Sequence, residues 1–589
     1  MAYNSYKEDE KSVEKSKLQT LKRLLSYLLK YKWTIVLVLM LMGYCVVVSL
    51  INPLIIESAI DNHIGNKDYI GLYKLLIIAL IINLIATFAI KLRMYIMAKM
   101  CNQILLTIRQ ELYTHIQKLG FKFFDSRPTG KILSRIIGDI NSLKDVLSNC
   151  VTTLIPDFIT VCAVVIIMFS KNPKLAVAAL ISTPFMAIAI TMIQVKAHPR
   201  WQTFRKKSSN LNAFLHEDMS GMKIIHSFTA EKETEETFDE LLNEHKSSFR
   251  SAVRLSDCFG SVIDFSWGFG CVALYFIGIV VLKDENISVG TFLAFGTYIN
   301  MFWQPINNLS NFYNQITTNI AGAERIFEIL DTKPEIEDEK GVVDLPDIKG
   351  EVTFDHVTFG YDEEKVLDDV SFVIKPGETI AIVGPTGAGK STIINLISRF
   401  YDANEGRVLL DGYDVKDVSI ESLRKQVGTM TQENFIFSGT VKDNIRYGKL
   451  DATDEEISEA AKAVNAHEFI MKLDKGYDTE LLERGGGLSI GQKQILALAR
   501  TMVSKPKILI LDEATSSIDT KTELIVQKGI DKLLSGRTSF VIAHRLSTIK
   551  RADRIFVVDN GKIIEEGNHR QLLEKKGAYY NLYMAQFNV

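Results

Sequence analysis

The residues best suited to chemistry in this 589-residue chain lie in GPTGAGKST, residues 384–392. This stretch matches the pattern G-x-x-x-x-G-K-[ST], is entered through the strand-like TIAIVG and leads into the helix-like TIINLISRF. Its glycines let backbone N–H groups face a phosphate, and the helix N-terminus adds positive potential. We therefore predict a nucleotide-phosphate site in which Lys390 supplies a point charge and Ser391 holds Mg²⁺. Its residues are Gly384, Thr386, Gly387, Gly389, Lys390, Ser391 and Thr392.

A second acidic element follows downstream. ILILDE, residues 508–513, is an apolar strand that ends in two carboxylates. Asp512 can orient the Mg²⁺ shell, and Glu513 can polarise an attacking water. Without a P-loop in the same chain, a strand ending in Asp-Glu would more often be a surface turn. Here the two elements together favour hydrolysis of a nucleotide.

A third element, ERGGGLSIGQKQILALAR at 483–500, is a glycine-rich turn that runs into a helix. The Ser489 hydroxyl and the exposed N–H groups at this helix N-terminus predict a second anion-binding site. Gly491 and Gln492 lie beside Ser489 in the sequence and are included in that site.

The P-loop, LSIGQ and ILILDE, in this order and spacing, resemble the nucleotide-binding domain of ATP-binding-cassette (ABC) transporters. The resemblance implies ATP and Mg²⁺ as ligands. It also implies that Tyr361, in FGYDEE, stacks on adenine; a packed strand aromatic is the alternative. Gln432, in TMTQENFIFSGTV, would reach Mg²⁺ and sense the membrane domain, and His544, in VIAHRLSTI, would contact the γ-phosphate. The motif SSID at 516–519 and the segment TELLERG at 479–485 depart mildly from the family pattern.

The composition adds a membrane component. Hydrophobic residues make up 47% of the chain, and most of six apolar stretches approach the ~20 residues that a helix needs to cross a bilayer. Residues 91–145 and 196–257 carry ten Lys and Arg each, against four in the three short connections together. The positive-inside tendency therefore places both long loops and both termini in the cytosol. The six stretches are 33–56, 70–90, 151–169, 175–195, 258–282 and 289–306.

Two features exclude other classes of partner. A net charge of −2 gives no electrostatic reason to expect nucleic acid. The six cysteines all lie in the first half of the chain without metal-ligand spacing. We therefore expect them to be buried thiols and not metal ligands or disulfides. The Lys-, Ile- and Asn-rich usage suggests a bacterial source, and we expect a multi-pass protein of the cytoplasmic membrane.

We expect four regions. The helical spacing of leucines from Leu18 to Tyr31 predicts a helix in the membrane interface, with an ordinary surface helix as the alternative. The polar, acidic, proline-containing segment 331–349 predicts a domain boundary, and beyond it alternating strand patterns predict an α/β domain. The regions are a cytosolic N-terminus and interfacial helix at 1–32, a transmembrane domain at 33–320, a linker at 321–349 and a nucleotide-binding domain at 350–589.

The six stretches resemble the transmembrane domain of ABC exporters. The expected fold is therefore an α-helical six-span transmembrane domain joined to an α/β P-loop domain. Around 125–130 and 219–225, the long loops resemble the coupling helices that contact nucleotide-binding domains in that family. The family's P-loop faces the LSGGQ-type signature of a second domain, and this chain has one of each. The resemblance thus implies a dimer that alternates between inward-facing and outward-facing states.

Ile490 departs from the common LSGGQ at its first glycine. A β-branched side chain there could restrict the backbone and crowd the partner's nucleotide. The chain's own Lys390, Asp512, Glu513 and His544 are intact, which resembles one subunit of a heterodimeric exporter with one degenerate site. A homodimer in which Ile490 is tolerated is the alternative, because position 490 contributes mainly backbone.

The expected substrate path rests on polar residues inside the spans. Amides recur at helical spacing in the sixth span, with Trp303 and Phe302 nearby, and intramembrane polar groups normally face protein or water. For the amides, the alternative is hydrogen bonding between helices. For the carboxylates of Asp157 and Asp264, the alternative is pairing with a basic residue such as Lys91 or Arg93. The path candidates are Asn300, Trp303, Gln304, Asn307, Asp157 and Asp264, with Asn308, Asn311 and Asn314 further along the stripe.

Such a lining favours export of amphipathic organic molecules of the multidrug type. We also expect membrane lipids to surround the spans. A homodimeric lipid or peptide exporter stays open. An ATP-gated channel or regulatory receptor is disfavoured by the intact Glu513 and by the lack of a regulatory insertion. The spans exclude a soluble ABC ATPase, and about thirty residues before the first span disfavour a peptidase-containing exporter.

Overall fold

The computed structural model describes residues 17–282, 287–338, 341–361, 364–431, 434–513, 520–543 and 546–587. These residues form two compact units. One is helical and comprises residues up to 117 together with 129–332; the other combines residues 118–128 with the chain from 333 onward. A short piece of the first long loop therefore folds with the C-terminal domain.

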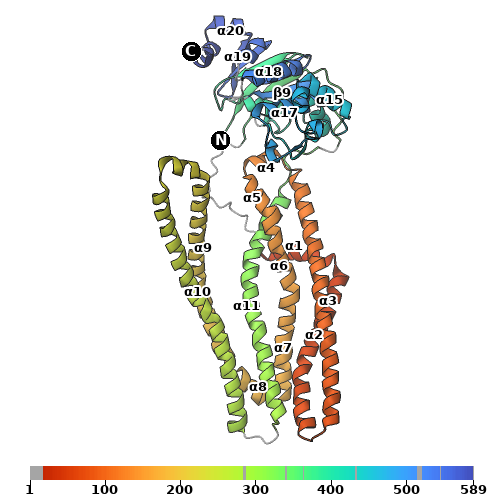
Figure 1. The fold of residues 1–589 in the computed structure, drawn as a ribbon, viewed down its shortest axis with the longest axis vertical. Coiled ribbons are helices and arrows are strands. Elements are labelled where there is room, and N and C mark those ends of the chain that lie inside the picture. Colours follow the sequence, from red (N-terminus) through yellow and green to blue (C-terminus); the bar gives the residue numbers. More distant parts are fainter. Residues whose placement is uncertain are drawn as a thin grey trace. The chain divides into compact units, whose positions relative to one another are not determined.

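The helical unit is built from helices of very different lengths (Figure 1). They are α1 (Lys17–Leu29), α2 (Lys32–Ser58), α3 (Tyr69–Ile116), α5 (Thr129–Ser134), α6 (Ile140–Asn149), α7 (Ile155–Lys171), α8 (Pro173–Leu180), α9 (Thr183–Phe228), α10 (Glu231–Phe276) and α11 (Val289–Asp331). Wider π-helical turns continue some of them, at η1 (Ala59–Ile64), η2 (Arg135–Asp139), η3 (Cys150–Leu154) and η4 (Ile277–Leu282).

Within the described residues, five helical stretches are long and apolar enough to cross a membrane. They are Lys32–Ile64, Tyr69–Ile116, Thr129–Lys171, Pro173–Phe228 and Glu231–Val280. The predicted sixth span, 289–306, lies in α11, which does not meet this criterion although it has 43 residues. Its asparagines and glutamines lower its hydropathy.

The helical core is formed where α2, α7, α8, α10 and α11 meet. Tyr298 of α11 is fully buried there, and its hydroxyl donates to the Leu50 carbonyl at 2.9 Å. Gly270 of α10 packs so closely on α8 that an added Cβ would lie 2.8 Å from the Ala179 oxygen. Small residues thus allow the close helix contacts typical of membrane interiors.

A polar cluster ties the ends of three helices together. Glu57 of α2 pairs with Lys171 at the end of α7 and accepts from the Thr291 hydroxyl of α11 at 3.0 Å. Asp61 accepts from the Ser288 hydroxyl and from the Gly290 N–H, the latter at 2.9 Å, at the start of α11. Asp61 therefore satisfies one N–H group that the first turn of α11 leaves unpaired, whereas Glu57 binds side chains of α7 and α11.

Helices α9 and α10 run side by side as an antiparallel hairpin (Figure 1). The Trp201 indole donates to Ser256 at 2.8 Å, and Lys207 pairs with Glu244 at 2.6 Å. Residues 219–225, which resemble a coupling helix, are part of α9, which continues up to Phe228. The turn that follows uses Thr229 in a left-handed conformation.

The amphipathic helix α1 packs on both α3 and α11. Its Arg23 pairs with Asp331 at 2.8 Å and lies 4.3 Å from the Phe327 ring centre. Tyr27 donates to Glu111 of α3 at 2.7 Å. The helix predicted at this position is therefore present and is joined to the C-terminal end of α11.

The second unit holds a six-stranded sheet of order β12-β11-β3-β10-β9-β6, a four-stranded sheet of order β2-β1-β4-β5, and the pair β7-β8. The strands are β1 (Val352–Phe359), β2 (Leu367–Ile374), β3 (Thr379–Val383), β4 (Glu405–Leu410), β5 (Tyr413–Asp414), β6 (Val427–Met430), β7 (Gly439–Thr440), β8 (Glu480–Leu481), β9 (Ile508–Glu513), β10 (Thr538–Ala543), β11 (Arg554–Asp559) and β12 (Lys562–Gly567). The helices are α4 (Phe121–Asp125), α12 (Lys390–Ile397), α13 (Ile420–Gln426), α14 (Val441–Arg446), α15 (Asp454–Ala463), α16 (His467–Ile470), α17 (Ile490–Ser504), α18 (Thr520–Leu534), α19 (Leu546–Arg551), α20 (His569–Lys575) and α21 (Ala578–Phe587). Single turns of tighter helix lie at η5 (Gly476–Asp478) and η6 (Glu483–Gly485).

Strand alternation builds two cores on opposite faces of the six-stranded sheet. In β9, Ile508 and Ile510 join one core, and Leu509 and Leu511 join the other. Helix α12 packs in the first core and α17 in the second. Side chains that alternate along a strand point to opposite faces, so the P-loop helix and the signature helix cover different sides of the sheet.

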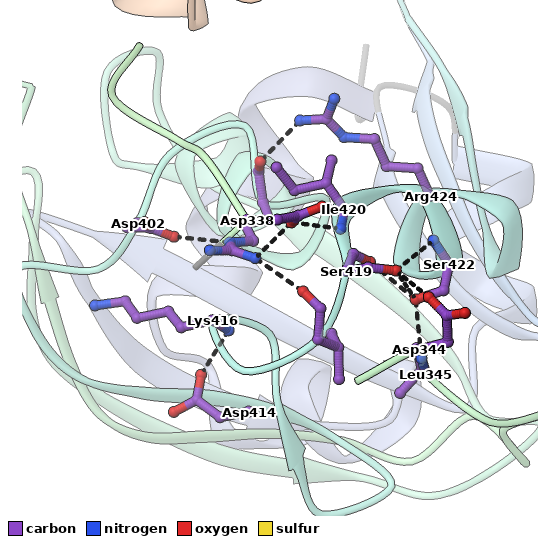
Figure 2. Close-up of polar contacts among 12 residues, drawn as sticks. Asp338, Asp344, Leu345, Asp402, Asp414, Lys416, Ser419, Ile420, Ser422 and Arg424 are labelled. Carbon is purple, nitrogen blue, oxygen red and sulfur yellow. Dashed lines mark hydrogen bonds and ion pairs between the residues drawn. The ribbon is translucent and has the colours of Figure 1, made fainter. Parts of the chain in front are cut away.

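The expected linker is divided between the two units. Residues 321–331 are the end of α11, whereas the chain after 333 packs on the α/β unit. Asp338 accepts from the Ile420 N–H at 3.0 Å, and Ser419 donates to Asp344 at 2.6 Å (Figure 2). The first turn of α13 thus secures this segment through hydrogen bonds.

Candidate active site

Four parallel strands bring the predicted motifs to one edge of the sheet. Strands β3, β10, β9 and β6 are parallel neighbours, with Glu513 opposite Ala543 and Leu511 opposite Met430. The carboxyl ends of parallel strands form the usual ligand edge of an α/β sheet. Gln432 and His544 lie outside the described residues; in the sequence they follow the ends of β6 and β10.

The loop between β3 and α12 has geometry that requires glycine. Gly384 has φ of 151°, and an added Cβ would collide with the Val558 carbonyl oxygen. Gly389 has φ of 104° and would place a Cβ 2.8 Å from the Leu367 side chain. Thr386 and Gly387 are exposed at the tip of the loop. The chain therefore turns tightly from strand to helix and leaves the tip of the loop exposed.

Lys390 is the first residue of α12 and folds over this loop. Its ammonium donates to the carbonyls of Gly384 and Pro385 at 2.9 and 2.7 Å. Burial lowers the pKa of Lys390 below its usual value, and the charge of Asp512 opposes this shift. The P-loop lysine and the β9 carboxylate are thus within electrostatic reach of each other.

The two hydroxyls after Lys390 differ in their surroundings. Ser391 is exposed, whereas Thr392 is buried and its hydroxyl shares a 3.2 Å hydrogen bond with Tyr361. Ser391 and Asp512 are oxygen donors of the type Mg²⁺ prefers, so these residues fit the ion. The Thr392 hydroxyl is thus engaged within the domain, and its predicted contact with the nucleotide stays a prediction.

Tyr361 lies beside the P-loop helix. Besides the bond to Thr392, its hydroxyl accepts from the Asn395 side chain at 3.2 Å. Its ring stands edge-on to Phe359 and Tyr401, each at 5.0 Å. The ring is thus held next to the helix whose N-terminus would receive the phosphates.

The signature motif begins α17 with a complete cap. The Ser489 hydroxyl accepts from the Gln492 N–H at 3.2 Å, and the Gln492 side chain accepts from the Ser489 N–H at 2.8 Å. Gly491 is buried. The side chain of Ile490 is 58% exposed. Ile490 therefore leaves the helix N-terminus intact and projects from the surface that carries Ser489.

Sequence analysis missed two groups of residues that organise this domain. Arg500 of α17 donates to the Phe435 carbonyl and to the Asn444 carbonyl, both at 2.9 Å, and so joins the signature helix to the segment after the Gln432 motif. The stretch Arg399–Asp402 follows α12 and contacts both the linker and α4. The second group reads RFYD in the sequence, directly after the P-loop helix, and no local periodicity distinguishes this run from an ordinary loop.

The predicted path residues are separated by the structure. Asn300 and Gln304 are exposed on one face of α11, and Asp264 is exposed on α10. Trp303 is only 3% exposed and packs in the helical core, so it is not part of that face. The side chain of Asn307, like those of Asn311 and Asn314, lies outside the described residues.

Asp157, at the start of α7, lies against α11. It is hydrogen bonded to the Asn308 side chain, and its Oδ2 atom is buried without a hydrogen-bond partner among the described residues. Among the residues that the structure describes, Asp157 does not pair with Lys91 or Arg93. Lys91 is exposed, and Arg93 lies near Cys45. The carboxylate is therefore offset by an amide and not by a cation.

Comparisons with known proteins agree with this architecture. Residues 33–306 match the family model of the ABC transporter transmembrane region. Residues 367–516 match the family model described as ABC transporter. The chain is 42% identical to the uncharacterized ABC transporter ATP-binding protein YknV of Bacillus subtilis, over 96% of this chain and 94% of that protein. It is 39% identical to an ATP-dependent lipid A-core flippase of Syntrophus aciditrophicus, over 82% and 81%.

A Staphylococcus aureus protein named for presumed multidrug export is 37% identical, over 96% of this chain and 100% of that protein. Among solved structures, a bacterial Atm1-family ABC exporter with ATP bound matches with a TM-score of 0.79 and 28% identity, over 95% of this chain and 99% of that one. The α/β domain is an ABC ATPase coupled to transport. The chain therefore belongs to the ABC transporter family, as an exporter half-transporter in which a helical transmembrane domain and a P-loop ATPase domain share one polypeptide.

Proposed function

We propose that this half-transporter exports amphipathic compounds of the multidrug type across the cytoplasmic membrane of a bacterium, by alternating access, paired with a different half-transporter. The observation that carries the proposal is the arrangement of the two anion sites. Lys390 lies within electrostatic reach of Asp512 at the edge of the sheet, whereas Ser489 begins a helix on the opposite face. Each P-loop can then use the signature of the other subunit.

ATP between two such domains would join them, and hydrolysis would release them. Ser391, Asp512 and Gln432 would hold Mg²⁺, which neutralises charge on the transferring phosphoryl group. Glu513 would polarise the attacking water and His544 would contact the γ-phosphate. The Ser489 hydroxyl accepts from the Gln492 N–H, so its own proton can be donated to a phosphate oxygen of the partner's nucleotide.

Ile490 is the reason for proposing an unequal pair. Its exposed, β-branched side chain stands beside Ser489, where it would crowd a nucleotide bound by the partner. In this arrangement Glu513 works against the partner's intact signature, and LSIGQ completes a weaker site. A homodimer is the second candidate, favoured by the intact reciprocal cap of Ser489 and Gln492.

The proposed substrate class rests on polar groups within apolar helices. Asn300, Gln304 and Asp264 are exposed in this chain, and such groups are costly against lipid. They would therefore face the second subunit or a water-filled path. The relatives include one protein named as a lipid A-core flippase and one named for multidrug export. A lipid flippase is the alternative, and an ATP-gated channel is a less favoured one.

The deciding experiment measures ATPase activity and native mass of this chain purified alone, with Glu513→Gln as the hydrolysis control. Little turnover that is restored by a co-expressed partner supports the unequal pair. Robust Glu513-dependent turnover from a two-chain particle refutes the obligate heterodimer and supports the homodimer. The absence of ATP-dependent turnover in both preparations would contradict the export mechanism.

A further inference from the structure

The segment after the P-loop helix receives contacts from the first long loop. Helix α4 lies in this loop, between α3 and α5, yet belongs to the same compact unit as the ATPase domain. The Tyr401 hydroxyl donates to Asp125 of α4. The rings of Phe121 and Phe400 are 4.5 Å apart, and Lys122 lies 4.0 Å from Glu335. Among the described residues, the contacts that join the loop to the domain thus include a hydrogen bond, an aromatic pair and an ion pair.

The linker that follows α11 also contacts the segment Arg399–Asp402. Arg399 is 3% exposed, pairs with Asp402 at 3.2 Å and donates to the Val418 carbonyl at 3.0 Å. It also lies 4.0 Å from Asp338 of the linker, which is drawn with Asp402 in Figure 2. Two separate connections to the transmembrane domain therefore meet within four consecutive residues, Arg399–Asp402.

Tyr401 joins these connections to the adenine side of the ATP site. It is 8% exposed, and its ring is perpendicular to the Tyr361 ring at 5.0 Å. Tyr361 is held from its other end by Thr392 and Asn395 of the P-loop helix. A displacement of the Tyr361 ring would therefore press on Tyr401 directly, because close-packed aromatic rings leave no space to absorb it.

Burial and the Asp125 carboxylate both raise the pKa of Tyr401 above its usual value. The hydroxyl therefore stays protonated at physiological pH and remains a donor to Asp125. Hydrogen bonds to a charged acceptor are stronger than neutral ones, so the bond is well suited to transmit a small movement.

We propose that Tyr401 is a positioning residue that couples occupancy of the adenine site at Tyr361 to the position of α4, through its hydrogen bond to Asp125. The proposal rests on ATP binding at the P-loop, as proposed above. Stacking of adenine on Tyr361 fixes the ring, Tyr401 follows it, and the Asp125 end of α4 is drawn to one position. Loss of this bond would leave ATP binding intact and release the loop from nucleotide control.

The test is hydrogen–deuterium exchange of the full chain carrying Glu513→Gln, with and without Mg·ATP, in the absence and presence of Tyr401→Phe. Peptides covering 384–397 report the P-loop, and peptides covering 119–128 report α4. In the parent, ATP should protect both regions. In Tyr401→Phe, the P-loop should stay protected, whereas the ATP-dependent change at 119–128 should fall about tenfold, as expected for one lost hydrogen bond to a charged group.

Matched variants separate the hydrogen bond from general damage. Asp125→Asn retains a carbonyl acceptor without the charge and should keep part of the ATP-dependent change, whereas Asp125→Ala should behave like Tyr401→Phe. Combining Asp125→Ala with Tyr401→Phe should add no further loss. Tyr413→Phe, at an exposed tyrosine of β5, removes a hydroxyl elsewhere in the domain and should change neither region.

The outcomes distinguish the two proposals. If ATP does not protect 384–397 in the parent, the proposed ATP site itself fails. The coupling role of Tyr401 is refuted, while ATP binding stands, if ATP protects 384–397 but changes exchange at 119–128 equally in the parent and in Tyr401→Phe. The same conclusion follows if ATP protects 384–397 in the parent but leaves exchange at 119–128 unchanged.

Discussion

At the residue scale, two glycines allow the P-loop to reach its conformation, and each does so for a specific reason. Gly384 has no room for a Cβ against the Val558 carbonyl, and Gly389 has none against Leu367. Both also adopt positive φ angles, which L-residues with a side chain rarely adopt. The loop's ability to approach a phosphate is therefore a property of these backbones and not of side-chain chemistry.

Gly384→Ala should weaken ATP binding much more than Gly387→Ala does. Both positions have positive φ, but a Cβ at 387 would meet open space, whereas one at 384 would collide with backbone. Gly387→Ala should thus suffer only the strain of its φ, about 1 kcal/mol, or roughly a fivefold weaker affinity. Titration with a fluorescent ATP analogue measures both variants. Equal losses at the two positions would contradict this geometry.

Asp157 offers a residue-scale test of substrate charge. Its carboxylate is bonded to Asn308 and has no cation beside it among the described residues, so it can attract a positively charged substrate inside the membrane. Asp157→Asn should abolish stimulation of the ATPase by tetraphenylphosphonium and leave stimulation by an uncharged amphiphile unchanged. Asp157→Glu keeps the charge and serves as the control. Undiminished stimulation by the cation in Asp157→Asn would rule out this role.

At the scale of elements, strand alternation decides which helix carries which half of an ATP site. Ile510 and Leu511 are neighbours in β9 yet belong to different cores. Because α12 and α17 each cover one of these cores, the P-loop and the signature of one chain lie on different faces of the sheet. Arg500 then links α17 to the segment that follows the Gln432 motif.

The C-terminal helices should loosen in acid. Burial, assisted by the charge of Lys550, lowers the pKa of His569 below its usual 6.5. Its Nδ1 shares a 2.7 Å hydrogen bond with Tyr579, whose pKa burial raises to about 12, so the tyrosine donates to neutral histidine. Below 6.5 the unfolded chain binds this proton before the folded chain does, so the stabilisation is lost as the pH falls through the folded pKa.

Hydrogen exchange of peptides from 569–587, corrected for intrinsic rates and compared at about pH 7.5 and about pH 5.5, measures this effect. Protection should decrease at the lower pH in the wild type. His569→Gln cannot titrate and should remove the difference between the two pH values. A pH dependence that persists in His569→Gln would assign it to another group.

At the scale of the whole molecule, the proposed dimer predicts unequal effects of P-loop and signature substitutions. In an unequal pair, Lys390→Met removes the active site, whereas Ser489→Ala affects only the weaker one. Turnover of the complex should therefore fall at least tenfold with Lys390→Met and less than about twofold with Ser489→Ala. In a homodimer, both substitutions affect both sites and should abolish turnover alike.

Ser489→Ala also removes a helix cap worth about 1 kcal/mol, so a control for this loss is needed. Thr453 caps α15 with the same reciprocal pattern, using Glu456. Thr453→Ala should lower stability by a similar amount without changing turnover. Steady-state phosphate release and thermal unfolding of the same preparations separate the two effects.

The local motifs and their order were readable from the sequence because each depends on a few neighbouring residues. The P-loop, the apolar strand before Asp512 and the apolar stretches of the spans follow from short-range patterns, and the ABC family and exporter fold that they predicted are confirmed. The division of residues 321–349 between the two units could not be predicted in this way, because it depends on packing against the α/β unit, beyond the local pattern.

Only the tertiary structure decided which distant residues meet. Tyr401 and Asp125 are 276 positions apart, and nothing in either segment identifies the other. The burial of Trp303 beside exposed Asn300 and Gln304 likewise depends on which face of α11 the other helices cover. Sequence determined the chemistry that each segment can perform, since that depends on side-chain type and local backbone. Folding decided which of these groups lie together, since contacts between distant segments arise from packing the whole chain.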